Sequence, residues 1–331
     1  MPKVVRVRAA GGPEVLKIEE EPLPQPGQGE VRLKVETIGL NRAEVMFRMG
    51  MYLEPLTPPS RIGYDAAGVV DAVGPGVTNV RVGQRVATVP SSPMSKYGVY
   101  GEYALVRALS VAPYPDVLSP REAAALWMSY LTVYGAFMLT TKIGKGDYVV
   151  IPAASSSLGF TAIQFCKREG AISIATTRGR EKKQALLEAG SDHVVVTDDE
   201  DFVGRIMEIT RGKGARIVFD PVSGPMLEKA ANVAAPGGTI IEYGWLAAPA
   251  PAIYPLFPAL VKQLTIVGYT LFGFTSDPAK VGAAVKYIND GITSGIFKPV
   301  VDDTKFTLDQ IAEAHRYMES NQQKGKVVVT V

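Results

Sequence analysis

The stretch over residues 147–180, DYVVIPAASSSLGFTAIQFCKREGAISIATTRGR, decides the fold. Tyr148–Ile151 is a short apolar, β-branched run, as expected for a strand that is buried on both faces. Small residues follow, and then a segment of helical period that stops at Gly170, where a glycine commonly ends a helix. A second apolar strand is expected over residues 171–175. Strand, turn, helix and strand together predict a βαβ unit that seats a dinucleotide pyrophosphate on the helix N-terminus.

The turn in this unit departs from the G-x-G-x-x-G pattern of dinucleotide sites. Ala153, Ser156 and Gly159 stand where the glycines are expected. The first position needs a tight turn, the second a close approach of the pyrophosphate to the backbone, and the third close packing of helix and strand. Alanine and serine meet the first two demands less well than glycine. The motif alone leaves two interpretations open: a nucleotide site, or small residues that only pack a helix on a sheet.

Length and composition limit the class of protein. The chain has 331 residues, which exceeds the usual size of a single hydrophobic core, so two domains are expected. A formal net charge of +2 gives no reason to expect nucleic acid or an anionic membrane as a partner. No apolar run reaches membrane-spanning length and the N-terminal segment lacks a signal-peptide core, so a cytoplasmic location is expected.

The few cysteines and histidines argue against a metal-dependent mechanism. Cys166 is the only cysteine, which excludes an intrachain disulfide, and its place in the apolar helix after the turn predicts a core-packing role. His193 and His315 are too far apart in the sequence to write a zinc site of familiar spacing. His315 lies among charged residues of a predicted helix, so we interpret it as a surface residue rather than a general base.

The first third of the chain is predicted to be a small β-rich domain. Residues 31–38, VRLKVETI, alternate apolar and polar positions, as in a half-solvated antiparallel strand. Asn41 is placed to cap a short helix that ends near Gly50. The glycine turn at residues 74–76 and the strands expected over residues 83–89 and 101–106 indicate a sharply bent barrel.

The pattern changes at Ser119, which forms a capping box with Glu122. From there, strands and helices alternate, with further strands expected at residues 193–196, 215–220, 239–243 and 264–269. This alternation predicts an α/β fold with a doubly wound parallel sheet. Helices are expected to begin at Asp277 and Thr307, and the apolar run 326–331 is expected to return to the N-terminal domain.

Four further segments carry a family resemblance: GLNRAEVMFRMGMY (39–52), RIGYDAAGVVDAVGPGVTNVRVGQRV (61–86), REAAALWMSYLTVYGAF (121–137) and HRYMESNQQKGKVVVTV (315–331). With the turn after Ile151, they resemble the zinc-free quinone oxidoreductases of the medium-chain dehydrogenase/reductase superfamily, the zeta-crystallin group. The resemblance spans nearly the whole chain. It implies a discontinuous GroES-like β-barrel catalytic domain over residues 1–122 and 296–331, and a Rossmann NADPH-binding domain over residues 123–295.

The chain departs from its zinc-dependent relatives at the metal ligands. Those relatives place a histidine-glutamate pair where this chain has Tyr64 and Asp65, and a cysteine in the segment around Ala43. The cysteine quartet of their structural zinc lobe is missing as well. The resemblance therefore implies a zinc-independent protein. Ser156 replaces the second glycine of the family's turn, and Thr197 stands where relatives often place a tyrosine on the adenine.

The residues after the second strand predict the choice of cofactor. An NAD site has an acid at the end of the second strand that binds the ribose hydroxyls, whereas an NADP site has cations or hydroxyls that bind the extra phosphate. The strand ends at Thr177 and is followed by Arg178, Arg180, Lys182 and Lys183, with Glu181 as the one acid. A solvated helix start is the alternative, but cations at a helix N-terminus oppose the helix dipole. We therefore expect NADPH.

The resemblance also implies a set of site residues. Asn41 and Tyr52 would lie near the nicotinamide and the substrate as catalytic residues, and Thr132 would bond the nicotinamide. Without the family, they would be a helix cap, a loop aromatic and a helix threonine that bonds its own backbone. Lys326 could equally be a surface charge. The implied cofactor-binding residues are Asn41, Thr132, Ala154, Ser155, Ser156, Ser157, Leu158, Thr177, Arg178, Lys182, Thr197, Tyr243, Gly244, Asn321 and Lys326.

The function implied by the resemblance is NADPH-dependent transfer of hydride, without metal, to a quinone or to the activated C=C bond of an enone. An enoyl-thioester reductase and a non-catalytic, crystallin-like NADPH-binding protein are the alternatives. The aromatic stretch over residues 254–274 would be core in a monomer. In the family, the corresponding region lies at a subunit contact, so a homodimer is expected.

Overall fold

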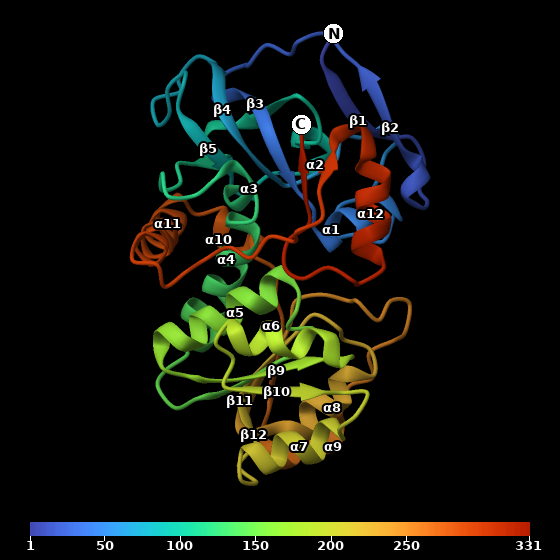
Figure 1. The fold of residues 1–331 in the computed structure, drawn as a ribbon, viewed down its shortest axis with the longest axis vertical. Helices are drawn as coiled ribbons and strands as arrows, with labels where there is room; N and C mark the ends of the chain where they lie inside the picture. Colours follow the sequence, from blue (N-terminus) through green and yellow to red (C-terminus); the bar gives the residue numbers. More distant parts are fainter. The chain divides into compact units, whose positions relative to one another are not determined.

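The computed structural model describes residues 1–331, which divide into two compact units (Figure 1). The first unit contains Met1–Ser129 and Phe274–Val331, and the second contains Tyr130–Gly273. The first unit is thus built from both ends of the chain. Residues 123–129 and 274–295 belong to it, although the sequence placed them in the nucleotide-binding domain. Functional boundaries at residues 122 and 296 stay a prediction.

The second unit is built on a six-stranded sheet of order β10-β9-β8-β11-β12-β13, in which every pair is parallel. Its strands are β8 (Tyr148–Ile151), β9 (Ile172–Thr177), β10 (His193–Val196), β11 (Ala215–Asp220), β12 (Ala234–Glu242) and β13 (Thr265–Gly268). The strand order reverses between β8 and β11, and doubly wound sheets bind ligands outside the carboxyl ends of the strands at such a point. The doubly wound parallel sheet predicted from the sequence is confirmed.

Helices cover both faces of this sheet: α5 and α6 lie over one face, and α7, α8 and α9 over the other (Figure 1). The helical segments of this unit are α5 (Ser157–Glu169), α6 (Lys183–Glu188), α7 (Phe202–Ile209), α8 (Met226–Val233), α9 (Leu256–Lys262) and a π-helical segment, Gly135–Thr141, that continues α4 (Trp127–Tyr134). Val150, Val195 and Ile240 lie in the core beneath α7 and α8. Burial on both faces explains why the strands are continuous apolar runs.

Helix α5 begins and ends where the sequence predicts. Ser156 is its N-cap, and the Ser156 hydroxyl accepts a hydrogen bond from the backbone N–H of Gly159 at 3.1 Å. Gly170 ends the helix with a left-handed φ of 73°, which glycine adopts without strain. Cys166 is fully buried on this helix, and burial raises the pKa of its thiol. The core-packing role predicted for Cys166 is confirmed.

The first unit contains a seven-stranded sheet whose central strand is β3, and a separate β1-β2 hairpin. Its strands are β1 (Lys3–Val7), β2 (Leu16–Glu20), β3 (Glu30–Gly39), β4 (Asp65–Val73), β5 (Arg85–Thr88), β6 (Tyr103–Arg107), β7 (Val111–Ala112), β14 (Phe306–Thr307) and β15 (Val328–Thr330). β3 pairs antiparallel with β4, β6 and β15. The last strand therefore returns to the N-terminal part of the chain, as predicted.

Capping residues fix the helix starts of this unit. Asn41 forms a capping box with Glu44 at α1, and Ser119 forms one with Glu122 at α3. Asp277 caps the longest helix, α11. The helices are α1 (Arg42–Arg48), α2 (Met94–Tyr97), α3 (Pro120–Ala123), α10 (Phe272–Thr275), α11 (Pro278–Thr293) and α12 (Ile311–Glu319). No helix of the chain combines the length and the apolar character needed to cross a lipid bilayer.

The surface position predicted for His315 is wrong. His315 is 0% exposed, because it lies on the same face of α12 as Ile311, Ala314 and Met318, which are also buried. Its ring packs edge-on against Tyr100 at 5.9 Å between centroids. Burial, followed by the charges of nearby arginines, lowers the pKa of His315 to about 3. His315 is therefore neutral at physiological pH, and its imidazole is a core group.

Candidate active site

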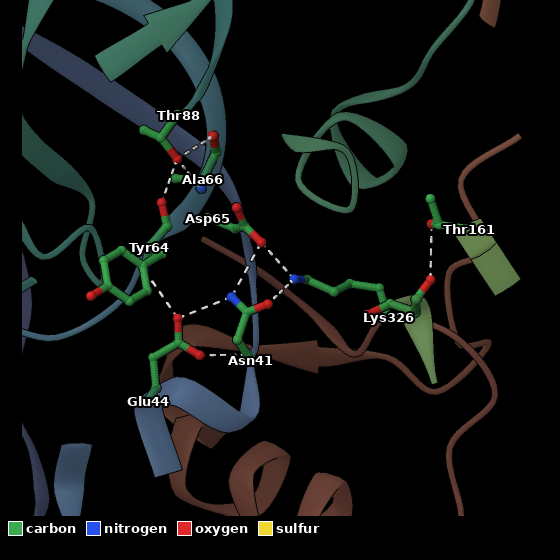
Figure 2. A network of polar contacts seen from close by, with 9 residues as sticks. Asn41, Glu44, Tyr64, Asp65, Ala66, Thr88, Thr161 and Lys326 are labelled. Atoms are coloured by element: carbon green, nitrogen blue, oxygen red, sulfur yellow. Dashed lines mark hydrogen bonds and ion pairs between the residues drawn. The ribbon is translucent and has the colours of Figure 1, made fainter. Parts of the chain in front are cut away.

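Four polar side chains, Asn41, Glu44, Asp65 and Lys326, form a buried cluster in the first unit (Figure 2). Asn41 follows β3, Asp65 begins β4, and Lys326 comes shortly before β15. These segments are far apart in the sequence but converge because β3 pairs with both other strands. We call these four residues the polar cluster.

Lys326 is held in the polar cluster by an ion pair with Asp65, whose Oδ2 lies 2.5 Å from the Lys326 Nζ. The same Nζ donates to Asn41 Oδ1. The lysine stem runs past Gly39, where a Cβ would lie 2.7 Å from Lys326 Cε. Lys326 is 1% exposed, so the alternative that it is a surface charge is wrong. A buried ammonium needs an anionic partner, and Asp65 supplies it.

Asn41 is both a helix cap and a member of the polar cluster. Its backbone N–H donates to Glu44 Oε2, which completes the capping box of α1. Its side-chain Nδ2 donates to Glu44 Oε1 at 3.0 Å and to Asp65 Oδ2 at 3.2 Å. An amide nitrogen carries two hydrogens. Both hydrogens of Asn41 are therefore directed at carboxylates of the chain.

Glu44 is the most deeply buried acid of the polar cluster. Besides Asn41, the backbone N–H of Tyr64 donates to its Oε1 at 3.0 Å. Burial raises the pKa of Glu44 to about 7, although the Lys326 ammonium and the hydrogen bond from Asn41 act in the opposite direction. Desolvation disfavours the carboxylate, and these partners only partly restore it. Glu44 thus exchanges its proton near neutral pH.

Tyr52 lies beside Tyr64, with ring centroids 6.4 Å apart. Burial raises the pKa of Tyr52 to about 12, and its hydrogen bond with Tyr64 lowers it only in part. The environment therefore makes Tyr52 a weaker acid than a tyrosine in water, not a stronger one. The Thr88 hydroxyl donates to the Tyr64 carbonyl at 2.6 Å and accepts from the Ala66 N–H at 2.8 Å (Figure 2). These two bonds hold the segment that carries Asp65.

The second candidate set lies at the carboxyl end of β8, in the second unit. The turn residues Ser155, Ser157 and Leu158 are partly exposed there, and the first N–H groups of a helix have no intrahelical acceptor. Ala153 has a left-handed φ of 50°, which strains a non-glycine residue. A Cβ on Gly159 would lie 2.3 Å from the Ala154 carbonyl oxygen. The turn and helix thus approach as closely as in a dinucleotide site.

The cations after β9 differ in their surroundings. Arg178 directly follows the strand, and its side chain is exposed. Arg180 forms an ion pair with Asp199, and Lys182 is only 8% exposed. Thr197 is tied to β9, because its backbone N–H donates to the Thr177 carbonyl at 2.8 Å. Arg178 is therefore the exposed cation that follows β9 most closely in the sequence.

Other implied cofactor residues have structural contacts of their own. Thr132 is 5% exposed within α4. Tyr243 stacks on Phe219 with 3.9 Å between ring centroids, and a Cβ on Gly244 would lie 2.8 Å from the Pro221 carbonyl oxygen. In the first unit, the Asn321 Oδ1 accepts a hydrogen bond from Arg42.

Comparison with known proteins identifies the family. Residues 27–116 match the alcohol dehydrogenase GroES-like domain, and residues 157–287 match the zinc-binding dehydrogenase family. A 2-haloacrylate reductase from a Burkholderia species is 31% identical over 98% of this chain and 97% of its own length. Quinone oxidoreductase 1 of Escherichia coli is 30% identical over 95% of both chains. The structure of an E. coli quinone oxidoreductase complexed with NADPH is similar at a TM-score of 0.93 and 29% identity, covering 99% of this chain and 100% of that chain.

The chain belongs to the zinc-free quinone oxidoreductase family. Membership confirms the α/β class with a GroES-like domain and a Rossmann-type sheet. The second match is to a family described as zinc-binding. This chain, however, has no group of three or more histidine, cysteine, aspartate or glutamate side chains that could hold a metal ion. Where zinc-dependent relatives have a metal ligand, Asp65 instead holds the Lys326 ammonium.

The sequence analysis did not select two acids of the polar cluster, Glu44 and Asp65, as site residues. Glu44 was detectable, because it follows Asn41 at the capping-box spacing that was recognised for Ser119 and Glu122. Asp65 was noticed only as a replaced metal ligand. Its pairing with Lys326 crosses most of the chain, and no local pattern predicts it.

A second pair of acids was missed at the carboxyl edge of the parallel sheet. Asp220 ends β11 and Glu242 ends β12, and the two residues are directly opposite in the register. Burial, followed by the charge of Asp220, raises the pKa of Glu242 to about 8. The sequence signal was present, since each acid closes an apolar run.

Proposed function

We propose that this protein is an NADPH-dependent oxidoreductase that transfers hydride, without a metal ion, to a quinone or to an activated C=C bond. The observation that carries the proposal is the edge formed by β8 and β9. There, a serine-capped helix N-terminus and an exposed arginine offer the two anion sites that a phosphorylated dinucleotide needs. Family membership sets the reaction class, because relatives are named quinone oxidoreductases and a 2-haloacrylate reductase.

The residues of the second unit fit NADPH. The turn Ala154–Leu158 and the first turn of α5 would hold the pyrophosphate, because Gly159 leaves room for the close approach that such a site requires. Thr177 and Arg178 would bind the extra phosphate, with further contacts from the other residues of the implied set. When bound, NADPH supplies the hydride.

The experiment that tests the cofactor is a titration of NADPH and NADH into the wild type, Arg178→Ala and Arg211→Ala. We expect the wild type to bind NADPH at least about tenfold more tightly than NADH, and Arg178→Ala to lose this preference. Arg211 is exposed after α7 and serves as the matched control. Equal affinities of the wild type for the two cofactors would refute the choice of NADPH.

The polar groups of the first unit suggest how the acceptor is activated. Hydride addition at the β-carbon of a conjugated carbonyl places negative charge on its oxygen, and a metal-free site must stabilise that charge with hydrogen-bond donors. We assign Tyr52 as the donor, while Asn41, whose amide hydrogens are directed at Glu44 and Asp65, positions the surrounding groups. The raised pKa of Tyr52 makes it a donor of a hydrogen bond more than of a proton.

Acceptor specificity is tested by NADPH oxidation against a panel of quinones and enones, with Tyr52→Phe as the variant. We expect Tyr52→Phe to slow enone reduction by about 10²-fold and quinone reduction by only a few-fold, since a reduced quinone is a stabilised aromatic oxyanion. Unchanged rates with both substrates would remove Tyr52 from the mechanism. A wild type that binds NADPH but reduces no acceptor would favour a non-catalytic, crystallin-like protein. Activity limited to enoyl thioesters would favour an enoyl-thioester reductase.

We also propose a homodimer, because the second unit has an exposed apolar surface around α9. Ile253, Phe257 and Val261 are 76%, 76% and 81% exposed, whereas apolar side chains of this size are usually buried. Within residues 254–274, which would be core in a monomer, Phe257 and Val261 are exposed instead. Sedimentation analysis of the wild type and Phe257→Glu should give a dimer and a monomer. A cytoplasmic location stays a prediction.

A further inference from the structure

The Lys326 ammonium is the one donor of the polar cluster with a hydrogen still available. A lysine ammonium has three N–H groups. One is directed at Asp65 Oδ2 and one at Asn41 Oδ1, and no third acceptor in the chain bonds this nitrogen. The Asn41 amide, in contrast, has both hydrogens engaged by Glu44 and Asp65.

The backbone around Lys326 is shaped for this side chain. Gly39 lies on β3, where any Cβ would stand 2.7 Å from Lys326 Cε and 2.1 Å from the Ala124 carbonyl oxygen. Glycine at this position lets the lysine stem run along the strand to Asp65. Figure 2 shows the extended stem with its ammonium directed at Asp65 and Asn41. Because the Lys326 ammonium is bonded to both Asp65 and Asn41, its position is fixed before any substrate binds.

We propose that Lys326 is a catalytic residue that supplies the positive charge of this metal-free site by donating its third N–H to the carbonyl oxygen of the acceptor. This role rests on the proposed function and adds to Tyr52 a second hydrogen-bond donor, which carries a positive charge. Asn41 is the most exposed member of the polar cluster, at 8%, and it contacts the ammonium directly. The acceptor oxygen therefore approaches Lys326 beside Asn41.

The step balances without a covalent bond to lysine. Hydride adds to the β-carbon, the π electron pair of the C=C bond shifts, and the carbonyl oxygen gains the negative charge. Lys326 donates a hydrogen bond to that oxygen and keeps its proton. A proton from water then reaches the α-carbon and regenerates the neutral carbonyl. Asp65 holds the ammonium in the same orientation throughout.

The experiment separates the catalytic role from a structural ion pair. Lys326→Met removes the cation and leaves Asp65 unpaired, whereas Lys326→Met with Asp65→Asn removes both charges together. Asp65→Asn alone leaves the buried lysine without its anionic partner, and Lys326→Arg tests rescue by another cation. For each variant we would measure kcat and KM with an enone and with a quinone, the dissociation constant of NADPH, and the melting temperature.

We expect the double variant to recover the melting temperature that Lys326→Met loses, yet to keep a kcat for the enone reduced by about 10²-fold or more. Lys326→Arg should recover part of the kcat that Lys326→Met loses, and Asp65→Asn should lower both kcat and the melting temperature, because the lysine loses the anion that orients it. Because Lys326 also belongs to the implied cofactor-binding set, kcat is measured at saturating NADPH, so that a loss of cofactor binding does not enter the comparison.

Two results would overturn the role. If the double variant reduces the enone as fast as the wild type, Lys326 only balances the charge of Asp65. If Lys326→Arg keeps the wild-type melting temperature but loses as much kcat as Lys326→Met, a cation at this position does not accelerate the reaction, and this comparison holds even when the double variant fails to fold. A wild type that reduces neither acceptor would refute the proposed function itself, which the variants do not address.

Discussion

Replacing Gly159 with alanine is expected to destabilise the second unit and to weaken NADPH binding. Gly159 is the third residue of α5, and a Cβ there would lie 2.3 Å from the Ala154 carbonyl oxygen and 2.5 Å from its carbonyl carbon. Carbon atoms prefer separations of about 3.5 Å or more, so the first turn of the helix must move away from the β8 turn by about 1 Å. The contacting atoms of Ala154 belong to its backbone, so no side-chain rotation can relieve the contact.

The size of the effect follows from that displacement. Inserting a methyl group into a closely packed contact costs about 1–3 kcal/mol. The displaced N–H groups are those that would hold the pyrophosphate, so the dissociation constant of NADPH should rise at least about tenfold, which corresponds to about 1.4 kcal/mol. Urea unfolding followed by circular dichroism measures the first quantity, and a fluorescence titration with NADPH measures the second.

Gly282→Ala is the matched control. Gly282 lies within α11, is exposed, and a Cβ there would meet nothing within 4 Å. Alanine has the higher helix propensity, so this change should stabilise the protein by up to about 1 kcal/mol and leave NADPH binding unchanged. The same substitution thus has opposite signs at the two positions. Wild-type stability and affinity in Gly159→Ala would show that close approach is not the reason for glycine.

Three further outcomes are expected. Ala153→Gly should stabilise the second unit by up to about 1 kcal/mol in urea unfolding, because φ of 50° strains alanine but not glycine. Folding raises the pKa of Glu44 from 4.5 to about 7, so protonated Glu44 contributes fully to the free energy of unfolding below pH 4.5, and this contribution is lost as the pH rises through 7. The free energy of unfolding should fall by about 3 kcal/mol over this range in the wild type, and this fall should be missing in Glu44→Gln. Activity should survive exhaustive chelation and elemental analysis should find no stoichiometric zinc, whereas activity that only added zinc restores would contradict the metal-free mechanism.

Local patterns predicted the elements whose cause is local. Three strands have the expected bounds, because each is a short and mostly buried apolar run: Tyr148–Ile151, His193–Val196 and Ala215–Asp220. β12 begins earlier than predicted, at Ala234, because that residue pairs with Ala215 across an irregularity in the register. The sequence of a strand does not reveal how it pairs with its neighbour, so this start could not be predicted from the segment alone.

The candidate site was predicted less completely, because burial and pairing depend on distant segments. Asn41 was selected through the family resemblance, but its partners come from distant segments: Asp65 begins β4 and Lys326 lies shortly before β15. His315 was misplaced because its sequence neighbours Glu313 and Arg316 are charged, although the helix turns its ring toward the core. The raised pKa of Tyr52 likewise arises from burial among residues that the local sequence does not reveal.

The return of β15 to β3 also sets an order of events during synthesis. A ribosome makes Asn41, Glu44 and Asp65 early, yet it adds the lysine that neutralises Asp65 only after all of the second unit, residues 130–273, has been made. Until then the growing polypeptide carries carboxylates that cannot be buried without a counter-charge, so this part of the first unit stays open while the second unit, whose residues 130–273 are continuous, can already fold. Translation that stops before residue 326 therefore yields a product with a competent nucleotide fold and an unfinished catalytic half, in which the part of β3 that β15 would cover can pair with another chain.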